Sequence, residues 1–224
     1  MKIDEIYSFR FAEEILNSVQ PLKSLWEEVL ECITSISDED LRFRHEQIKD
    51  KENTKSLSKA INQLLDEKLK SKKWNDQSGI FSIPEFQEGK ESTWTLDFSK
   101  AVTLENGSPS GIAVEVAFNH AEAASWNLTK PVLAAEINDM RVQTHIGEGI
   151  GIVIVASSSL KKNGAFDGAV GDFERYKKTL NAMRSQLTVP ILLIGLAAPE
   201  TFKVQAKSQK NSIYKSGEVV PVNS

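Results

Sequence analysis

The first 73 residues carry the apolar spacing of amphipathic helices. Apolar side chains recur at i, i+3, i+4 and i+7 in residues 22–36, directly after Pro21, which is tolerated in a first helical turn. Residues 57–69 repeat this spacing. The charged stretch between them, residues 37–54, is typical of a short helix followed by a loop. We therefore predict a mainly helical part over residues 1–73.

The spacing of apolar residues becomes strand-like after Trp74. Three segments fit strands bounded by Gly, Pro, Asn and Ser: residues 79–84, 93–104 and 111–118. Two further segments are nearly continuous apolar runs, as expected for strands buried on both faces: residues 149–156 and 190–196. An antiparallel hairpin that leads into alternating strands and helices predicts a mixed central β-sheet.

Helices fill the remaining intervals of this second part. Residues 121–140 look helical, although Pro131 should kink that helix or divide it in two. Residues 171–187 form another candidate helix. The predicted fold class is α/β, with an antiparallel hairpin in a mixed sheet that is flanked by helices. We expect a single domain over residues 1–224, with an α/β core over 74–200 and a basic tail over 201–224.

Composition narrows the class of protein. The chain has 224 residues and no apolar stretch near the roughly 20 residues that span a bilayer. Its start lacks the charged-then-apolar order of a signal peptide, so we expect a soluble, cytoplasmic protein with no membrane partner. Cys32 is the only cysteine, which excludes an intrachain disulfide and a cysteine-cluster zinc site.

Net charge limits contact with nucleic acid to local surfaces. The formal charge of -4 argues against general binding of polyanions. One region is nevertheless basic, because residues 201–217 contain four lysines and no acid: Lys203, Lys207, Lys210 and Lys215. These lysines fit either a solvated tail or a clamp over a DNA backbone.

Two acids carry the strongest chemical signal. Asn106-Gly107 lies midway between Asp97 and Glu115, so a hairpin turning there would place the two acids opposite each other. Opposed carboxylates repel unless a cation offsets the repulsion, and a hard divalent metal ion is the natural occupant. Alternatively, Asn106-Gly107 is only a loop and the acids are unrelated. Spacing alone leaves both interpretations open.

Three segments carry a resemblance to a known family. They read Leu-Asp-Phe-Ser-Lys over 96–100, Ile-Ala-Val-Glu-Val-Ala-Phe-Asn over 112–119, and Ile-Leu-Leu-Ile-Gly-Leu-Ala-Ala-Pro over 191–199. In order and interval the chain resembles type II restriction endonucleases of the BglII, BstYI and BamHI group, in the PD-(D/E)XK nuclease superfamily. The resemblance implies Mg²⁺-dependent hydrolysis of double-stranded DNA at a short palindrome, by a homodimer. The relatives also suggest a site centred on GATC.

The resemblance assigns the catalytic positions one by one. It implies that Asp97, Glu115 and the main-chain carbonyl of Val116 bind Mg²⁺, with Ca²⁺ or Mn²⁺ able to substitute for binding. The third catalytic position is 117, where the family has Gln, Glu or Lys and this chain has Ala117. Three explanations are open: a deliberate substitution that holds DNA uncleaved, which we favour, a third polar group recruited from elsewhere, or an inactive relative. Asp76 and Gln77 match a region that supplies a further polar residue in some members.

The same resemblance suggests the DNA contacts. Asn119 and His120 follow the catalytic strand, where relatives enter the major groove, and Asn can read adenine bidentately. A second loop offers Lys161, Lys162, Asn163 and Asp167, and the tail offers Lys203, Lys207 and Lys210 for phosphates. Each of these residues also fits an ordinary cap, loop or solvated surface.

Two other functions remain compatible with the sequence. Ala117 would allow a sequence-specific DNA-binding module that keeps the nuclease fold without catalysis. The acid pair would also suit a metal-dependent phosphoesterase acting on another substrate. For the expected homodimer, the surface that we predict lies on residues 121–140.

Overall fold

A six-stranded mixed sheet forms the centre of the molecule. The computed structural model describes residues 1–52, 54–82, 94–136, 146–208 and 215–222. In spatial order the strands are β1 (Ile3–Phe9), β6 (Ile191–Leu196), β5 (Ile150–Ala156), β4 (Pro109–Val116), β3 (Thr95–Thr103) and β2 (Asn75–Gly79). β4, β5 and β6 are parallel, and the other pairings are antiparallel. The predicted α/β class with an antiparallel hairpin is confirmed.

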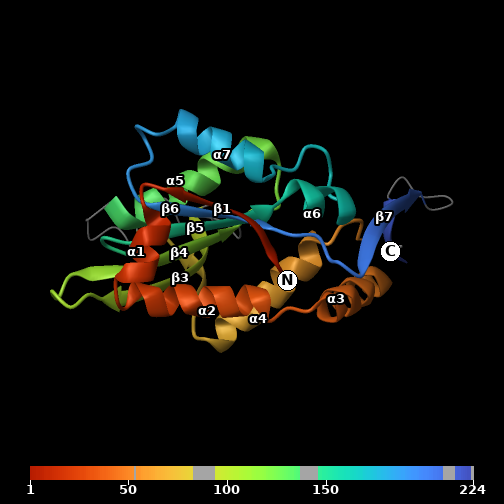
Figure 1. The fold of residues 1–224 in the computed structure, drawn as a ribbon, viewed down its shortest axis with the longest axis horizontal. Coiled ribbons are helices and arrows are strands. Elements are labelled where there is room, and N and C mark those ends of the chain that lie inside the picture. Colours follow the sequence, from red (N-terminus) through yellow and green to blue (C-terminus); the bar gives the residue numbers. More distant parts are fainter. Residues whose placement is uncertain (53, 83–93, 137–145, 209–214, 223–224) are drawn as a thin grey trace.

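Helices cover both faces of this sheet (Figure 1). One face carries α1 (Ala12–Ser18), α2 (Leu22–Thr34) and α4 (Ser58–Ser71), and the other carries α5 (Ala124–Glu136) and α7 (Phe173–Ala182). The remaining helical elements are α3 (Asp38–Lys51), η2 (Ala121–Ala123) and α6 (Ser158–Asn163). Strand alternation explains the two layers: on β5, Ile152 packs into the core on the α2 side and Val153 into the core on the α5 side.

Helix predictions in the N-terminal part hold, with one extension. α2 and α4 lie where the apolar spacing predicted them. α3 is longer than the predicted short helix and spans 14 residues. Its start is fixed by a capping box, in which the Ser37 side chain accepts from the Asp40 backbone N–H and the Asp40 side chain accepts from that of Ser37.

Three parts of the β-structure differ from the prediction. β1 was not expected, because it lies in a segment that we predicted to be mainly helical. β2 begins at Asn75 and ends at Gly79, earlier than the predicted strand over 79–84, of which residues 83 and 84 lie outside the described residues. The C-terminal part, predicted as a basic tail, contains the paired strands β7 (Phe202–Ser208) and β8 (Lys215–Pro221). Phe202 and Val204 of β7 are buried in the core.

The β3–β4 hairpin has the predicted register. Phe98 pairs with Val114 and Thr103 with Pro109, so the two numbers of each pair have the constant sum expected for a hairpin centred on residue 106. At the turn Gly107 adopts a φ of 84°, a left-handed conformation that glycine accepts without strain. The interpretation of Asn106-Gly107 as an unrelated loop is therefore wrong, and Asp97 and Glu115 lie next to the last pair of the ladder.

Candidate active site

Backbone N–H groups of β3 and β4 each donate to a carboxylate on the other strand. The Asp97 N–H donates to Glu115 Oε1 at 3.2 Å, and the Val116 N–H donates to Asp97 Oδ2 at 2.8 Å. Each carboxylate is therefore anchored by the backbone of the opposite strand. Both donors belong to the hairpin, so β3 and β4 each help to hold the carboxylate of the other strand.

The surroundings of the two carboxylates nevertheless differ, because Asp97 lies past the last pair of the β3–β4 ladder and lines a cavity beside α4. Glu115 is 1% exposed and lies between Ala113 and Ala117, on the face covered by α5. On β3, Leu96 packs into the core on the α5 side whereas Phe98 packs into the core on the α2 side. The regular alternation is thus interrupted at Asp97, where the ladder with β4 has ended.

Asp97 lines a polar cavity on the side of α4. The cavity has a volume of about 310 Å³ and is lined by Asn62, Gln63, Asp66, Gln77, Asp97, Phe98 and Val116. Gln77 was one of two candidates for a further polar residue, and its side-chain oxygen accepts from Thr95 Oγ1 at 3.3 Å. The other candidate, Asp76, forms an ion pair with Lys70 at 2.7 Å. Only Gln77 of the two lines this cavity.

A buried lysine completes the surroundings of Glu115. Lys130 extends from α5, and its Nζ forms an ion pair with Glu115 Oε2 and donates to the Thr95 carbonyl oxygen at 3.0 Å. The Lys130 side chain is only 10% exposed. Lys130 was not among the predicted site residues. Its signal in the sequence is weak: a single lysine in the otherwise mainly apolar run of residues 128–135.

The electrostatics of Glu115 favour a cation. Burial, together with the negative charge of Asp97, raises the pKa of the Glu115 carboxyl to about 8, and Lys130 acts in the opposite direction. A divalent ion at the pair would lower that pKa and so favour the charged carboxylate. Within the described ranges, no group of three or more His, Cys, Asp or Glu side chains could hold a metal ion. A bound ion would therefore need a backbone oxygen or water as a ligand in addition to Asp97 and Glu115. Mg²⁺ commonly binds one or two carboxylates and keeps several water ligands.

Ala117 lies on the same strand face as Glu115 but in apolar surroundings. It is 2% exposed and belongs to a core cluster with Ala113, Ala124 and Leu128. A third catalytic side chain at position 117, which the resemblance implies, would have to face the metal site. The structure instead places it beneath α5, and Ala117 lines neither the polar cavity beside Asp97 nor the larger cavity described next.

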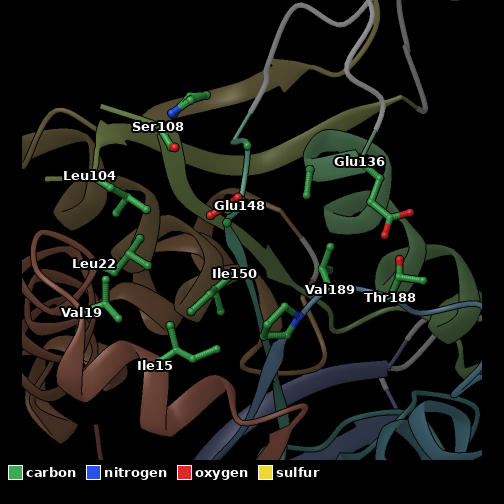
Figure 2. Close-up of a pocket in the computed structure, with 15 residues that line it drawn as sticks. Ile15, Val19, Leu22, Leu104, Ser108, Glu136, Glu148, Ile150, Thr188 and Val189 are labelled. Carbon is green, nitrogen blue, oxygen red and sulfur yellow. The ribbon is translucent and has the colours of Figure 1, made fainter. Parts of the chain in front are cut away.

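A larger cavity lies at the other end of the sheet. Its volume is about 630 Å³, and it opens where β3 ends and where β4 and β5 begin. Figure 2 shows Ile15 of α1, Leu22 of α2 and Val19 between these helices on one side of it, with Glu136 and Thr188 across from them. The acid pair lies at the opposite ends of these strands, where open α/β sheets usually bind their ligands. Size alone therefore does not locate the active site.

Comparison with protein families decides the identity. The family model described as Restriction endonuclease BglII/BglIII matches residues 5–196. The chain belongs to this endonuclease family. It is therefore a type II site-specific deoxyribonuclease of a family that generally uses divalent metal ions. A search of curated proteins finds no match.

A solved structure shares the fold of this endonuclease. The crystal structure of restriction endonuclease BglII complexed with a DNA 16-mer is 21% identical to this chain, with a TM-score of 0.62. The match covers 99% of this chain and 100% of that one. The crystal structure of free BglII is 17% identical, with a TM-score of 0.48 and the same coverage. In the part of the chain that the structure describes, no helix has the length and apolar character needed to cross a bilayer.

The two segments of the endonuclease predicted to read bases lie side by side. The Gly171 N–H donates to the Asn119 carbonyl oxygen at 3.1 Å, and the Ala121 N–H donates to that of Ala169 at 2.8 Å. Asn119 and His120 are exposed. The side-chain oxygen of Asn119 already accepts from Asn127 Nδ2 at 3.1 Å.

The buried Tyr176 holds both Asn119 and Asn127 through its hydroxyl group. It is fully buried, and its hydroxyl accepts from Asn127 Nδ2 at 2.8 Å and donates to Asn119 Oδ1 at 3.4 Å. Neither Asn127 nor Tyr176 was predicted to matter to the site. The network holds the Asn119 side chain in one orientation and leaves its amide nitrogen available to donate.

The other predicted DNA contacts are scattered over the described surface. Lys161 lies in α6 and not in a loop, and its Nζ donates to the Val170 carbonyl oxygen at 2.6 Å, so it braces the loop that follows this helix. Lys162 and Asp167 are exposed and Asn163 is half-buried, and Asp167 forms an ion pair with Lys55. On β7, Lys203 is half-buried, whereas Lys207 is exposed and pairs with Glu218. Lys210 lies outside the described residues.

Proposed function

We propose that this endonuclease hydrolyses double-stranded DNA at a short palindromic site in a Mg²⁺-dependent reaction. Asp97, Glu115 and the main-chain carbonyl of Val116 would hold the ion. The observation that carries this proposal is the pair of carboxylates held by backbone hydrogen bonds from the opposite strands. Asp97 of this pair lines a cavity of about 310 Å³. The similar BglII structure is complexed with a DNA 16-mer, which supports duplex DNA as the substrate.

The roles of the chain's own residues follow from their contacts. A bound divalent ion would lower the pKa of the attacking water and neutralise charge at the phosphate. Asp97 is oriented for this task by the Val116 N–H, and Glu115 by the Asp97 N–H and by Lys130. Fixed ligands of this kind need no reorganisation during the reaction.

Recognition is assigned to the joined segments around Asn119. Asn119 and His120 would meet base edges, together with Asn163 at the end of α6 and Asp167 on the loop that follows it. Lys161, Lys162 and the lysines at 203, 207 and 210 would meet phosphates, although Lys161 would first have to leave its internal contact. A GATC centre of the palindrome follows from the relatives named above and stays a prediction.

A homodimer is part of this proposal, because cutting both strands of a palindrome needs two active sites related by a two-fold axis. The predicted surface is residues 121–140. Of this segment, α5 buries one side against the sheet, and residues 137–140 lie outside the described residues. In the described part of this segment, η2 and the outer side of α5 are available to a partner. Sedimentation should show a dimer at micromolar concentration, free or on DNA, and a monomer in both states would contradict it.

The decisive experiment is metal-dependent cleavage of a random duplex library. The bound fraction is first selected in Ca²⁺, and cleavage is then measured in Mg²⁺ and in EDTA. We expect Asp97→Asn to reduce the rate by at least about 1,000-fold, because a metal ion supplies several kcal/mol and each 1.36 kcal/mol is tenfold. Glu105→Gln, which removes an exposed carboxylate from the same hairpin, is the matched control and should cut normally.

Ala117 favours one competing function, a sequence-specific DNA-binding module without catalysis. Such a module would bind its site equally well in Ca²⁺ and in EDTA, and it would cut in neither Mg²⁺ nor Mn²⁺. That result would refute the proposed hydrolysis and leave DNA recognition intact. Of the three explanations for Ala117, the buried contact of Lys130 with Glu115 favours recruitment of another polar group.

A further inference from the structure

The ammonium group of Lys130 is held in an unusually protected position. It contacts Glu115 Oε2 and the Thr95 carbonyl oxygen, and the side chain is 10% exposed. Taking a lysine and a glutamate out of water costs several kcal/mol per ion, and their attraction offsets this only with good geometry. Apolar residues of similar volume would stabilise the fold as well or better. Stability alone therefore does not explain this pair.

The position of Lys130 is set by close packing of α5 on the sheet. Next to it, Pro131 lies against Gly151 of β5, where an added Cβ would come within 2.8 Å of the Pro131 Cβ. A glycine thus allows α5 to approach closely at this point. The consequence is that Lys130 has a fixed place from which its side chain reaches Glu115.

The Lys130–Glu115 pair lies beside position 117, where this chain lacks the polar side chain of the family pattern. Position 117 is next along the same face of β4 after Glu115, and Ala117 offers no polar atom there. Lys130 brings a donor and a positive charge to that face from the helix above. We propose that Lys130 takes the place of the polar side chain that position 117 lacks, as a positioning residue that acts through Glu115.

This inference rests on the proposed nuclease site and gives Lys130 two tasks. It holds the Glu115 carboxylate in one orientation, together with the Asp97 N–H on the other carboxylate oxygen. It also brings its ammonium group close to the proposed point at which negative charge develops during phosphodiester hydrolysis. Fixed charges in a water-poor site stabilise such charge more strongly than they would in water.

Three substitutions separate charge from shape. Lys130→Met removes the charge and the donor, Lys130→Gln keeps a donor without charge, and Lys130→Arg keeps both. We expect single-turnover cleavage in Mg²⁺ to fall by about 10²–10⁴ in the Met and Gln variants and to recover largely in the Arg variant. DNA affinity in EDTA should stay within about threefold in all three, because Lys130 is buried. Lys59→Met, which breaks an exposed pair with Glu52, is the matched control.

A second measurement does not depend on cleavage. The Lys130 ¹⁵Nζ resonance, observed in EDTA, should shift when Ca²⁺ is added to the unmodified protein. It should not shift in Asp97→Asn, which lacks one of the two proposed carboxylate ligands. If the Lys130 ¹⁵Nζ resonance of the unmodified protein does not shift on addition of Ca²⁺, Lys130 is not coupled to the metal site and the inference is wrong.

The outcomes of the cleavage assay distinguish this inference from the proposed function. If the Gln variant cuts like the unmodified protein, Lys130 is structural and the inference is wrong. The comparison of Gln with Arg decides this even if the Met variant does not fold. If the unmodified chain is inactive and Ala117→Gln is active, the inference is wrong but the nuclease function stands. If no variant cuts any duplex, the proposed function itself fails.

Discussion

Enlarging Ala117 tests whether this position once held a catalytic side chain. Ala117 is 2% exposed and packs in one cluster with Ala113, Ala124 and Leu128. The two cavities described above do not reach it, so Ala117→Gln has no such space to fill. We expect the glutamine variant to be less stable and to cut DNA no faster than the unmodified protein.

The size of the effect follows from the burial. Overpacking a well-filled core costs about 1–3 kcal/mol. An amide left without a partner adds about 1–3 kcal/mol unless it reaches a polar neighbour. For a chain of this length each kcal/mol lowers Tm by about 2–4 °C. The same change at exposed Ala206 on β7 is the matched control and should be within about 0.5 kcal/mol.

Urea unfolding and single-turnover cleavage, measured on the same preparations, provide the assay. A glutamine variant that keeps full stability and cuts at least about 100-fold faster, the lower range for a group that positions or deprotonates water, would refute this reasoning. It would show that the native side chain at 117 is polar and that alanine was introduced to stop cleavage. A variant that is destabilised and no faster supports the role of Lys130.

Three further predictions concern regions outside the acid pair. Burial lowers the pKa of His45, so the free energy of unfolding should fall as pH drops below about 6.5 towards that lowered pKa. In His45→Gln the free energy of unfolding, measured in urea, should depend less on pH across this window. Tyr176→Phe should lower the free energy of unfolding in urea by about 1 kcal/mol, because the hydrogen bond to Asn119 is lost. It should also weaken discrimination between bases in a site selection. Unchanged selectivity would show that Asn119 does not read bases. Lys207→Gln should reduce the slope of log affinity against log salt by about 1 for all duplexes alike, and an unchanged slope would place β7 away from the DNA.

The hairpin and its acid pair could be predicted because the rule that governs them is local. Pairing across a turn at Asn106-Gly107 follows from counting, and the observed ladder has that register. The orientation of Asp97 could not be predicted in this way. Its side chain faces α4 because the alternation of β3 is interrupted beyond the last paired residue, and this depends on packing by Leu96 and Phe98.

Strands at the edges escaped prediction because their partners are distant or polar. β1 pairs with β6, whose residues lie almost at the other end of the chain. β2 reads Asn-Asp-Gln-Ser-Gly and carries no apolar alternation at all. β7 and β8 bury only a few side chains, such as Phe202 and Val204, so their composition resembles that of a solvated tail.

Lys130 shows the limit of helical periodicity. The sequence predicted that this segment is helical, without a face assigned to the core. It could not indicate which strand the helix meets, and a lysine on it has no interpretation until Glu115 is found beneath. The same holds for Asn127 and Tyr176, which meet Asn119 only in the folded chain.

The contact between Gly151 and Pro131 should couple the evolution of two positions, glycine at 151 and lysine at 130. No side chain of Gly151 exists to touch a substrate, yet an alanine there would push α5 outwards at the residue next to Lys130. Among relatives that carry alanine at the third catalytic position, lysine on the helix and glycine on the strand should therefore be retained or lost together. Relatives with a polar residue at that position would be free to vary at both.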